Sequence, residues 1–257
     1  MPALSSTSLA DTLWPLLVTL VFVLAGLVKG VVGLGLPTIA MALLALLMAP
    51  AQAAALLIVP SLVTNIWQLR PWSALGPLLR RLAPMQAGVC LGTLAGAWAL
   101  GAPAGAWATV CLGAALTGYA AWGLNGARLQ LRACSEPWLG PVIGAVTGLV
   151  TAATGVFVIP AVPYLQALDL QRDELIQAMG ISFTFSTLAL AAGLYFNAQY
   201  SSASLGASAL LLLPALAGMA LGQCLRHRLS PQLFKTLFLC SLFVLGLHMV
   251  IKELLAL

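Results

Sequence analysis

One lysine stands inside a long apolar stretch of this sequence. Lys29 lies between the mostly apolar residues 13–28 and 31–49, and no Asp or Glu lies within any apolar block of the chain. A cation placed there costs about 2.5 to 3.5 kcal/mol on membrane-insertion scales unless water, a partner or a ligand compensates its charge. We expect that ligand to be an anion. The alternative is a lysine whose flexible stem carries its charge to the membrane surface.

Glycine-containing breaks provide further groups that suit an anion. Gly33 and Gly35 follow Lys29, and Gly155 occupies a similar place in the second half of the chain. We expect helices to begin after Gly35 and Gly155, because the free N–H groups and the dipole of a helix N-terminus attract anions. Three threonines near the breaks could add hydroxyl donors: Thr38, Thr151 and Thr154.

Two further apolar blocks each carry a polar face. The first has polar residues at i, i+4 and i+7, and the second at i, i+4 and i+5, so each set lies on one side of a helix. These residues are Ser61, Asn65 and Gln68 in the first block and Ser182, Ser186 and Thr187 in the second. Polar faces of membrane helices usually turn inward. We keep two interpretations, substrate contact and hydrogen bonds between helices.

Patterns typical of enzymes do not accompany these residues. The two histidines, His227 and His248, belong to no HExxH pattern, and the sequence contains no G-x-S-x-G motif. Its five cysteines form no CxxC pair. We therefore predict that the protein is not an enzyme and that it needs neither a metal nor a cofactor.

Composition indicates where these residues act. The chain has 257 residues, of which 61% are hydrophobic and 7% are charged, and its mean hydropathy is +1.05. Soluble domains carry roughly a quarter charged residues, and disordered or nucleic-acid-binding chains also need more polar residues than this. We predict an all-α polytopic membrane protein with a single membrane domain over 1–257, in contact with the lipid bilayer and with no nucleic-acid partner.

The apolar blocks predict the membrane-spanning elements. They lie at about 13–49, 51–69, 82–100, 105–124, 138–167, 176–196, 205–225 and 232–251. The first and fifth blocks are too long for one span and contain glycine and proline breaks, so each must turn back. We expect each to form a hairpin of two arms of about 14 to 16 residues, re-entrant rather than fully spanning.

Basic residues predict the orientation. They cluster in alternate connections: Arg70, Arg80, Arg81, Arg128, Arg132, Arg172, Arg226, Arg228 and Lys235. The connections near 50, 101–104 and 197–204 contain none. The positive-inside rule then places the basic connections in the cytoplasm and both termini on the periplasmic or extracellular side. Each half becomes a broken-helix hairpin plus three helices, and the two halves are inverted.

The sequence itself contains traces of this inverted repeat. Repeat 1 covers about 13–124, a cytoplasmic linker about 125–137, and repeat 2 about 138–251. The stretch that begins at Gly26 aligns with the one that begins at Gly144, 118 positions later. Broken helices at equivalent positions of two halves indicate a secondary transporter with a site near the midplane. Glycines four residues apart predict close helix packing in two matching spans: Gly88, Gly92 and Gly96, and Gly218 and Gly222.

Three motifs also resemble those of a known family. They are G-L-V-K-G-V-V-G-L-G-L-P from Gly26, A-A-A-L-L-I-V-P-S-L-V-T-N from Ala53 and G-L-V-T-A-A-T-G-V-F-V-I-P from Gly148. They resemble the paired repeat motifs of the TauE/SafE sulfite-exporter family, also called the TSUP family, over roughly residues 14–251. The resemblance implies a permease of the bacterial inner membrane that exports sulfite, sulfoacetate or another organosulfur or organic anion. Proton coupling is a further implication of the resemblance.

We therefore expect a transporter that moves a small anion by alternating access. Lys29 would supply charge, the hairpin amides and threonines would supply donors, and the polar faces around Asn65 and Ser186 would line the cavity. Two alternatives stay open, an anion channel and a membrane scaffold that transports nothing. The oligomeric state is open between a monomer and a homodimer.

Overall fold

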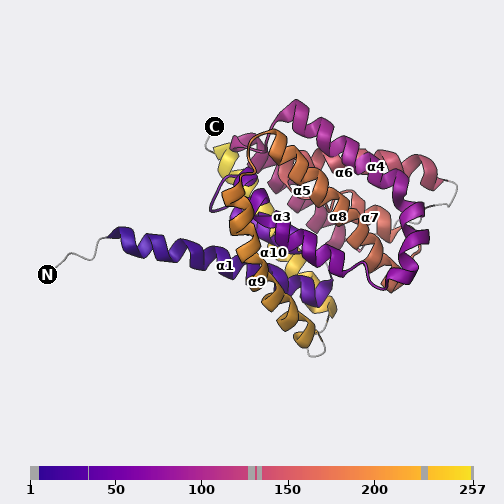
Figure 1. The fold of residues 1–257 in the computed structure, drawn as a ribbon, viewed down its shortest axis with the longest axis horizontal. Coiled ribbons are helices and arrows are strands. Elements are labelled where there is room, and N and C mark those ends of the chain that lie inside the picture. Colours follow the sequence, from indigo (N-terminus) through magenta and orange to yellow (C-terminus); the bar gives the residue numbers. More distant parts are fainter. Residues whose placement is uncertain (1–5, 34, 127–130, 132–134, 227–230, 256–257) are drawn as a thin grey trace.

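The computed structural model describes residues 6–33, 35–126, 131, 135–226 and 231–255. Within them the chain forms ten α-helices and one 3-10 turn (Figure 1). In chain order these are α1 (Ser6–Val32), α2 (Leu36–Leu44), α3 (Pro50–Trp67), the turn η1 (Trp72–Ala74), α4 (Leu75–Leu100), α5 (Gly105–Leu124), α6 (Glu136–Thr154), α7 (Ala161–Gln166), α8 (Arg172–Phe196), α9 (Ser202–Leu225) and α10 (Pro231–Leu255). Arg128, Arg132, His227 and Arg228 of the sequence analysis lie outside the described residues.

Most of the described helices are built to cross a membrane. Six of them, α1, α3, α6, α8, α9 and α10, are both long and apolar enough to span it. Helices α4 and α5 have 26 and 20 residues, which also suffices by length. Large apolar side chains stand exposed on the outer surface of the bundle, as lipid contact requires. The chain is an all-α polytopic membrane protein, as its sequence predicts.

The two predicted hairpins exist, but their arms are unequal. Helix α1 has 27 residues and α2 has nine, while α6 has 19 and α7 has six. The expectation of arms of about 14 to 16 residues is wrong. Helix α1 begins at Ser6, before its apolar block, and both return arms are shortened by residues that are not α-helical, 45–49 and 156–160. The breaks themselves lie at Gly35 and Gly155, which adopt left-handed φ angles of 112° and 71°. Return arms of about 14 and 9 Å are too short to span a bilayer.

The helix contacts follow the order of the elements in the two halves. Helices α1 to α5 form the first half, and α6 to α10 repeat the same order of one long, one short and three long helices. Helix α1 packs along α9, and its counterpart α6 packs along α4. Likewise α3 contacts α9 while α8 contacts α4, and the counterparts α3 and α8 pack on one another, as do α5 and α10. Figure 1 shows α4 and α6 side by side.

Glycines form the closest of these helix crossings. At each of eight positions an added Cβ would overlap backbone atoms of the opposing helix. The positions are Gly26, Gly30, Gly218 and Gly222 where α1 crosses α9, and Gly88, Gly92, Gly144 and Gly148 where α4 crosses α6. The predicted close packing is therefore confirmed at Gly88, Gly92, Gly218 and Gly222, whereas a Cβ added at Gly96 would meet the side chain of Ala152. The aligned glycines of the sequence take part in corresponding crossings.

The described basic connections gather at one end of the bundle. Gln177 of α8 donates hydrogen bonds to the carbonyl oxygens of Leu69 and Pro71. Arg81 of α4 lies 2.5 Å from Glu136 of α6 and also donates to the carbonyl oxygen of Leu168. We call the end of the bundle that carries these basic connections the basic end. The end that carries connections 101–104 and 197–201 is called the opposite end. Which end faces the cytoplasm stays a prediction.

Candidate functional site

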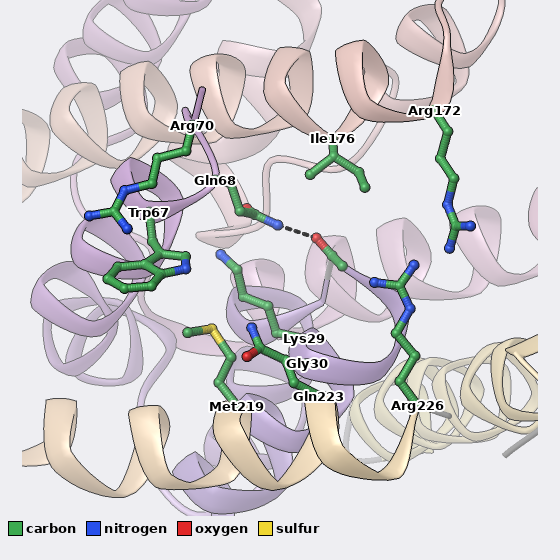
Figure 2. A pocket seen from close by; sticks show the side chains of 11 residues that line it. Lys29, Gly30, Trp67, Gln68, Arg70, Arg172, Ile176, Met219, Gln223 and Arg226 are labelled. Carbon is green, nitrogen blue, oxygen red and sulfur yellow. Dashed lines mark hydrogen bonds between the residues drawn. The ribbon is translucent and has the colours of Figure 1, made fainter. Parts of the chain in front are cut away.

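A cavity of about 640 Å³ opens at the basic end (Figure 2). It lies between α1, α9, the C-terminal end of α3 and the start of α8, and we call it the vestibule. Four of its lining side chains are cationic: Lys29, Arg70, Arg172 and Arg226. The other lining residues are Gly30, Gly33, Trp67, Gln68, Ile176, Met219 and Gln223. The described lining thus contains four cations and no Asp or Glu.

Lys29 lines the vestibule with a side chain that is only 3% exposed. It lies in the last turn of α1 rather than in the helix break, because the helical hydrogen bonds continue through Val32 and from Gly33 N–H to the Lys29 carbonyl. Its ammonium nitrogen donates to the side-chain oxygens of Asn65 at 2.5 Å and Thr64 at 3.1 Å. Both acceptors are neutral. They solvate the charge without neutralising it, and they leave one of the three N–H donors for a ligand.

Asn65 extends this contact from the first half of the chain into the second. Its side-chain nitrogen lies 3.5 Å from the hydroxyl of Thr187 on α8, which in turn donates to the carbonyl oxygen of Phe183. Asn65 and Thr187 are both buried. The chain of contacts from Lys29 through Asn65 to Thr187 therefore joins α1, α3 and α8, and it fixes the direction in which the lysine points.

Gln68 holds the helix break beside Lys29. Its side-chain nitrogen donates to the carbonyl oxygen of Gly33, the contact drawn as a dashed line in Figure 2. Its side-chain oxygen is buried and has no partner among the described residues. Gly33 has a φ of 86°, so this turn of backbone suits glycine.

The three arginines are positioned by the ends of three different helices. Arg70 follows α3 and lies over the Trp67 ring, 4.1 Å from its centre. Arg172 begins α8, Arg226 ends α9, and Figure 2 shows their guanidinium groups pointing toward one another. Like charges that converge without a described acid repel one another, so an anion between them is favoured.

Four of the predicted site residues are buried and do not line the vestibule. Their hydroxyls are buried and have no hydrogen-bond partner among the described residues: Thr38, Ser61, Ser182 and Ser186. On α3, Ser61 lies one turn farther from the basic end than Asn65. Buried polar groups in proteins are nearly always hydrogen-bonded, so these hydroxyls call for water or a ligand.

The second hairpin contributes nothing to the described lining of the vestibule. Thr151 and Thr154 donate their hydroxyls to carbonyl oxygens of their own helix, at 2.7 and 2.6 Å. The expected helix start after Gly155 is wrong. Gly155 ends α6 and packs against Met41, residues 156–160 are not helical, and α7 begins only at Ala161. At Gly35, by contrast, α2 does begin as expected, although Gly35 packs against Phe238 and does not line the vestibule.

The three arginines were predicted from the sequence as markers of membrane orientation and not as site residues. Lys29, Gly33 and Gln68 were predicted and do line the vestibule, and Asn65 was predicted and holds Lys29. The one feature of the sequence that could have indicated a role for these arginines in the site is their position beside the ends of apolar blocks. That these three ends meet is a property of the tertiary packing alone.

Comparison with known proteins gives one match. Residues 18–249 match the model of a family described as "Sulfite exporter TauE/SafE". A search of curated proteins and a search of solved structures found no match. The matched range includes every residue that lines the vestibule.

Proposed function

The chain belongs to the TauE/SafE sulfite exporter family, and on this premise we propose that it binds a small anion in the vestibule and moves it across the membrane. One observation carries this proposal. Four cationic side chains line a cavity whose described lining has no acid, and one of the four is buried among neutral groups. Such an excess of positive charge in a low-dielectric setting attracts and concentrates anions.

The substrate we propose is sulfite, a sulfonate such as sulfoacetate, or another small organosulfur or organic anion. Guanidinium groups present paired N–H donors that fit the oxygens of sulfonate and carboxylate groups. A vestibule of about 640 Å³ holds such an anion together with its water. Export is the proposed direction, with protons as the proposed coupling ion, and both follow from the family.

Within the vestibule the charged residues would act in sequence. Arg172 and Arg226 would attract the anion from solution. Arg70, whose guanidinium group is positioned by its contact with the Trp67 ring, would bind the anion next. The anion then accepts the N–H of Lys29 that neither Asn65 nor Thr64 accepts. Pairing with the anion neutralises the buried cation, so closing the helices around the loaded site costs less free energy than closing them around the empty one.

Beyond Lys29 the path would continue through neutral donors. The unpartnered hydroxyls of Ser61, Ser182 and Ser186 can replace the water that the anion loses. Because hydroxyl donors carry no charge, they hold the anion weakly enough to release it. This is the role we propose for the polar faces of α3 and α8.

We also propose that the two halves are inverted repeats related by a two-fold axis in the membrane plane. The helix contacts support the repeat: α1 of the first half packs on α9 of the second, and its counterpart α6 packs on α4, the counterpart of α9. Alternating access then follows from rocking one set of helices against the other around the shared site. The proposed location is the bacterial inner membrane, with both termini on its outer side and the basic end in the cytoplasm.

Thermal-shift measurements on the purified protein test the proposal. A ligand that binds only the folded state raises the melting temperature with its concentration. We expect sulfite or sulfoacetate to do so for the wild type, with choline as the matched cation control. At the same concentrations, these anions should raise the melting temperature of a Lys29→Ala variant much less, because its Kd is higher. If no anion of a panel of sulfite, sulfoacetate, sulfate, acetate and thiosulfate shifts the wild type, the proposed site is wrong.

A further inference from the structure

A second, much smaller cavity lies at the opposite end of the bundle. Thr93 and Ala97 of α4 line it together with Ala152 of α6, Gly193 of α8 and Asn197 after α8. Its volume is about 10 Å³, room for a single water molecule at most. An anion cannot enter it in this state.

The positions of the two cavities correspond in the two halves of the chain. The vestibule lies where α1 crosses α9, and the small cavity lies where the counterparts α6 and α4 cross. The correspondence extends to single residues. Gly30 faces the backbone nitrogen of Gln223, and Gly148, its aligned glycine, faces the backbone nitrogen of Thr93. Gln223 lines the vestibule and Thr93 lines the small cavity.

The two ends differ in one contact. At the opposite end, the side-chain amide of Asn197 donates to the carbonyl oxygens of Ala97 at 3.0 Å and Gly193 at 2.9 Å. The bond to Ala97 ties the end of α8 to α4 across the small cavity, and the bond to Gly193 stays within α8. At the basic end, the residue that follows α3 is Gln68, which lines the open vestibule and donates to Gly33 instead, and within the described residues it makes no hydrogen bond to α9.

The closed cavity also contains an unsatisfied polar group. The Thr93 hydroxyl is fully buried and has no partner among the described residues. Burial of an unpaired hydroxyl is unfavourable, and water entering an opened cavity would satisfy it. The hydrogen bond from Asn197 to Ala97 therefore stabilises the closed state, and the unpaired hydroxyl of Thr93 destabilises it.

We propose that the small cavity is the second mouth of the anion path and that Asn197 keeps it shut while the vestibule is open. This inference rests on the proposed function. When the bond from Asn197 to Ala97 breaks, α8 and α4 separate at the opposite end and the vestibule closes. The anion bound beside Lys29 then leaves through the second mouth. Asn197 is a positioning residue that sets the balance between the two states.

Labelling of engineered cysteines tests this balance. The full chain is purified in detergent after its five native cysteines are replaced, and the reagent is the anionic 2-sulfonatoethyl methanethiosulfonate. Thr93→Cys, a substitution of similar size, reports on the small cavity, and Gln223→Cys reports on the vestibule. Mass spectrometry gives the labelling rate of each reporter without and with Asn197→Ala. Asn125→Ala, an exposed asparagine at the end of α5, is the matched control.

We expect Asn197→Ala to raise the labelling rate of Thr93→Cys by about five- to tenfold and to lower that of Gln223→Cys. Asn125→Ala should change neither rate. Asn197→Asp keeps the size of the side chain but removes the amide donor, so it should act in the same way if the alanine variant folds poorly. An unchanged rate at Thr93→Cys, or a rise there without a fall at Gln223→Cys, overturns the proposal.

The labelling experiment needs no substrate. If the two reporters respond oppositely but no anion binds, the proposed substrate is wrong and the second mouth stands. If anions bind but the reporters do not respond, the proposed function stands and the second mouth is wrong.

Discussion

The side-chain oxygen of Asn65 lies 2.5 Å from the ammonium nitrogen of Lys29. Both side chains are buried, and they belong to α3 and α1. A carboxylate at this place would neutralise the lysine, whereas an amide orients it and leaves its charge uncompensated. Lys29 thus stays available to an anion that enters from the vestibule.

Replacing Lys29 removes the charge that we expect to bind the anion. Lys29→Ala should raise the Kd for sulfite or sulfoacetate by about tenfold or more, since a hydrogen bond to a charged group contributes roughly 1.5 to 3 kcal/mol. Lys29→Arg should retain part of the affinity. Expression should stay near the wild-type level, and the exposed Lys252→Ala serves as control. Titration of each purified variant gives the Kd, and an unchanged value for Lys29→Ala would return this lysine to a structural role.

The vestibule arginines should act mainly on the rate of binding. Arg172→Gln and Arg226→Gln should each slow association several-fold at low salt and have little effect at 1 M, where the screening length is about 3 Å. Arg80→Gln, an exposed arginine that does not line the vestibule, is the matched control. Stopped-flow fluorescence can follow binding, because Trp67 lines the cavity. Equal effects of all three substitutions would show a general surface-charge effect instead.

Asn65 and Ser186 should respond differently to alanine, although the sequence predicts that the polar faces around both line the cavity. Asn65 bonds Lys29, so Asn65→Ala should lower the free energy of unfolding by about 1 to 3 kcal/mol and weaken anion binding as well. Ser186 has no described partner, so Ser186→Ala should leave the apo melting temperature unchanged while the anion affinity falls. Melting curves with and without ligand separate the two effects. A loss of apo stability in Ser186→Ala with unaltered affinity would make its hydroxyl a link between helices.

The same substitution, Gly→Ala, should change stability differently at glycines inside and outside the helix crossings. An added methyl group at Gly222 or Gly148 would meet backbone of the opposing helix, so Gly222→Ala and Gly148→Ala should each cost about 1 to 3 kcal/mol. Gly118 of α5 has open space around it, and Gly118→Ala should be neutral or slightly stabilising. Thermal unfolding in detergent measures all three. Equal melting temperatures would mean that the crossings are looser than the structure shows.

Orientation in the membrane can be read from reporter fusions. Fusions at Ala102 and Arg128 should report opposite sides of the membrane, with Arg128 in the cytoplasm, because basic connections are retained there. Fusions at both termini should report the outer side. Reporters at Ala102 and Arg128 on the same side would contradict both the topology and the inverted repeat.

Local features of the sequence predicted the helices and part of the site. Hydropathy located the spans, and an unpaired lysine in an apolar block marked Lys29 before any fold was known. The lengths of the hairpin arms were wrong. Helix α1 continues through Gly26 and Gly30, where α9 packs closely on it, and the return arms lose residues 45–49 and 156–160 to turns and non-helical chain. The role of Arg226 could not be predicted, since it depends on how α9 meets α3 and α8.

The most direct test of the vestibule is counterflow of radiolabelled sulfite and of radiolabelled sulfoacetate into proteoliposomes that contain the purified protein. Vesicles preloaded with the same unlabelled anion should take up label transiently above its external concentration, which a carrier does and a channel does not. Vesicles that contain Lys29→Ala should take up label only as fast as liposomes without protein. Uptake by Lys29→Ala equal to that of the wild type, or no counterflow of either anion by the wild type, would contradict the role of Lys29 in carrying the anion.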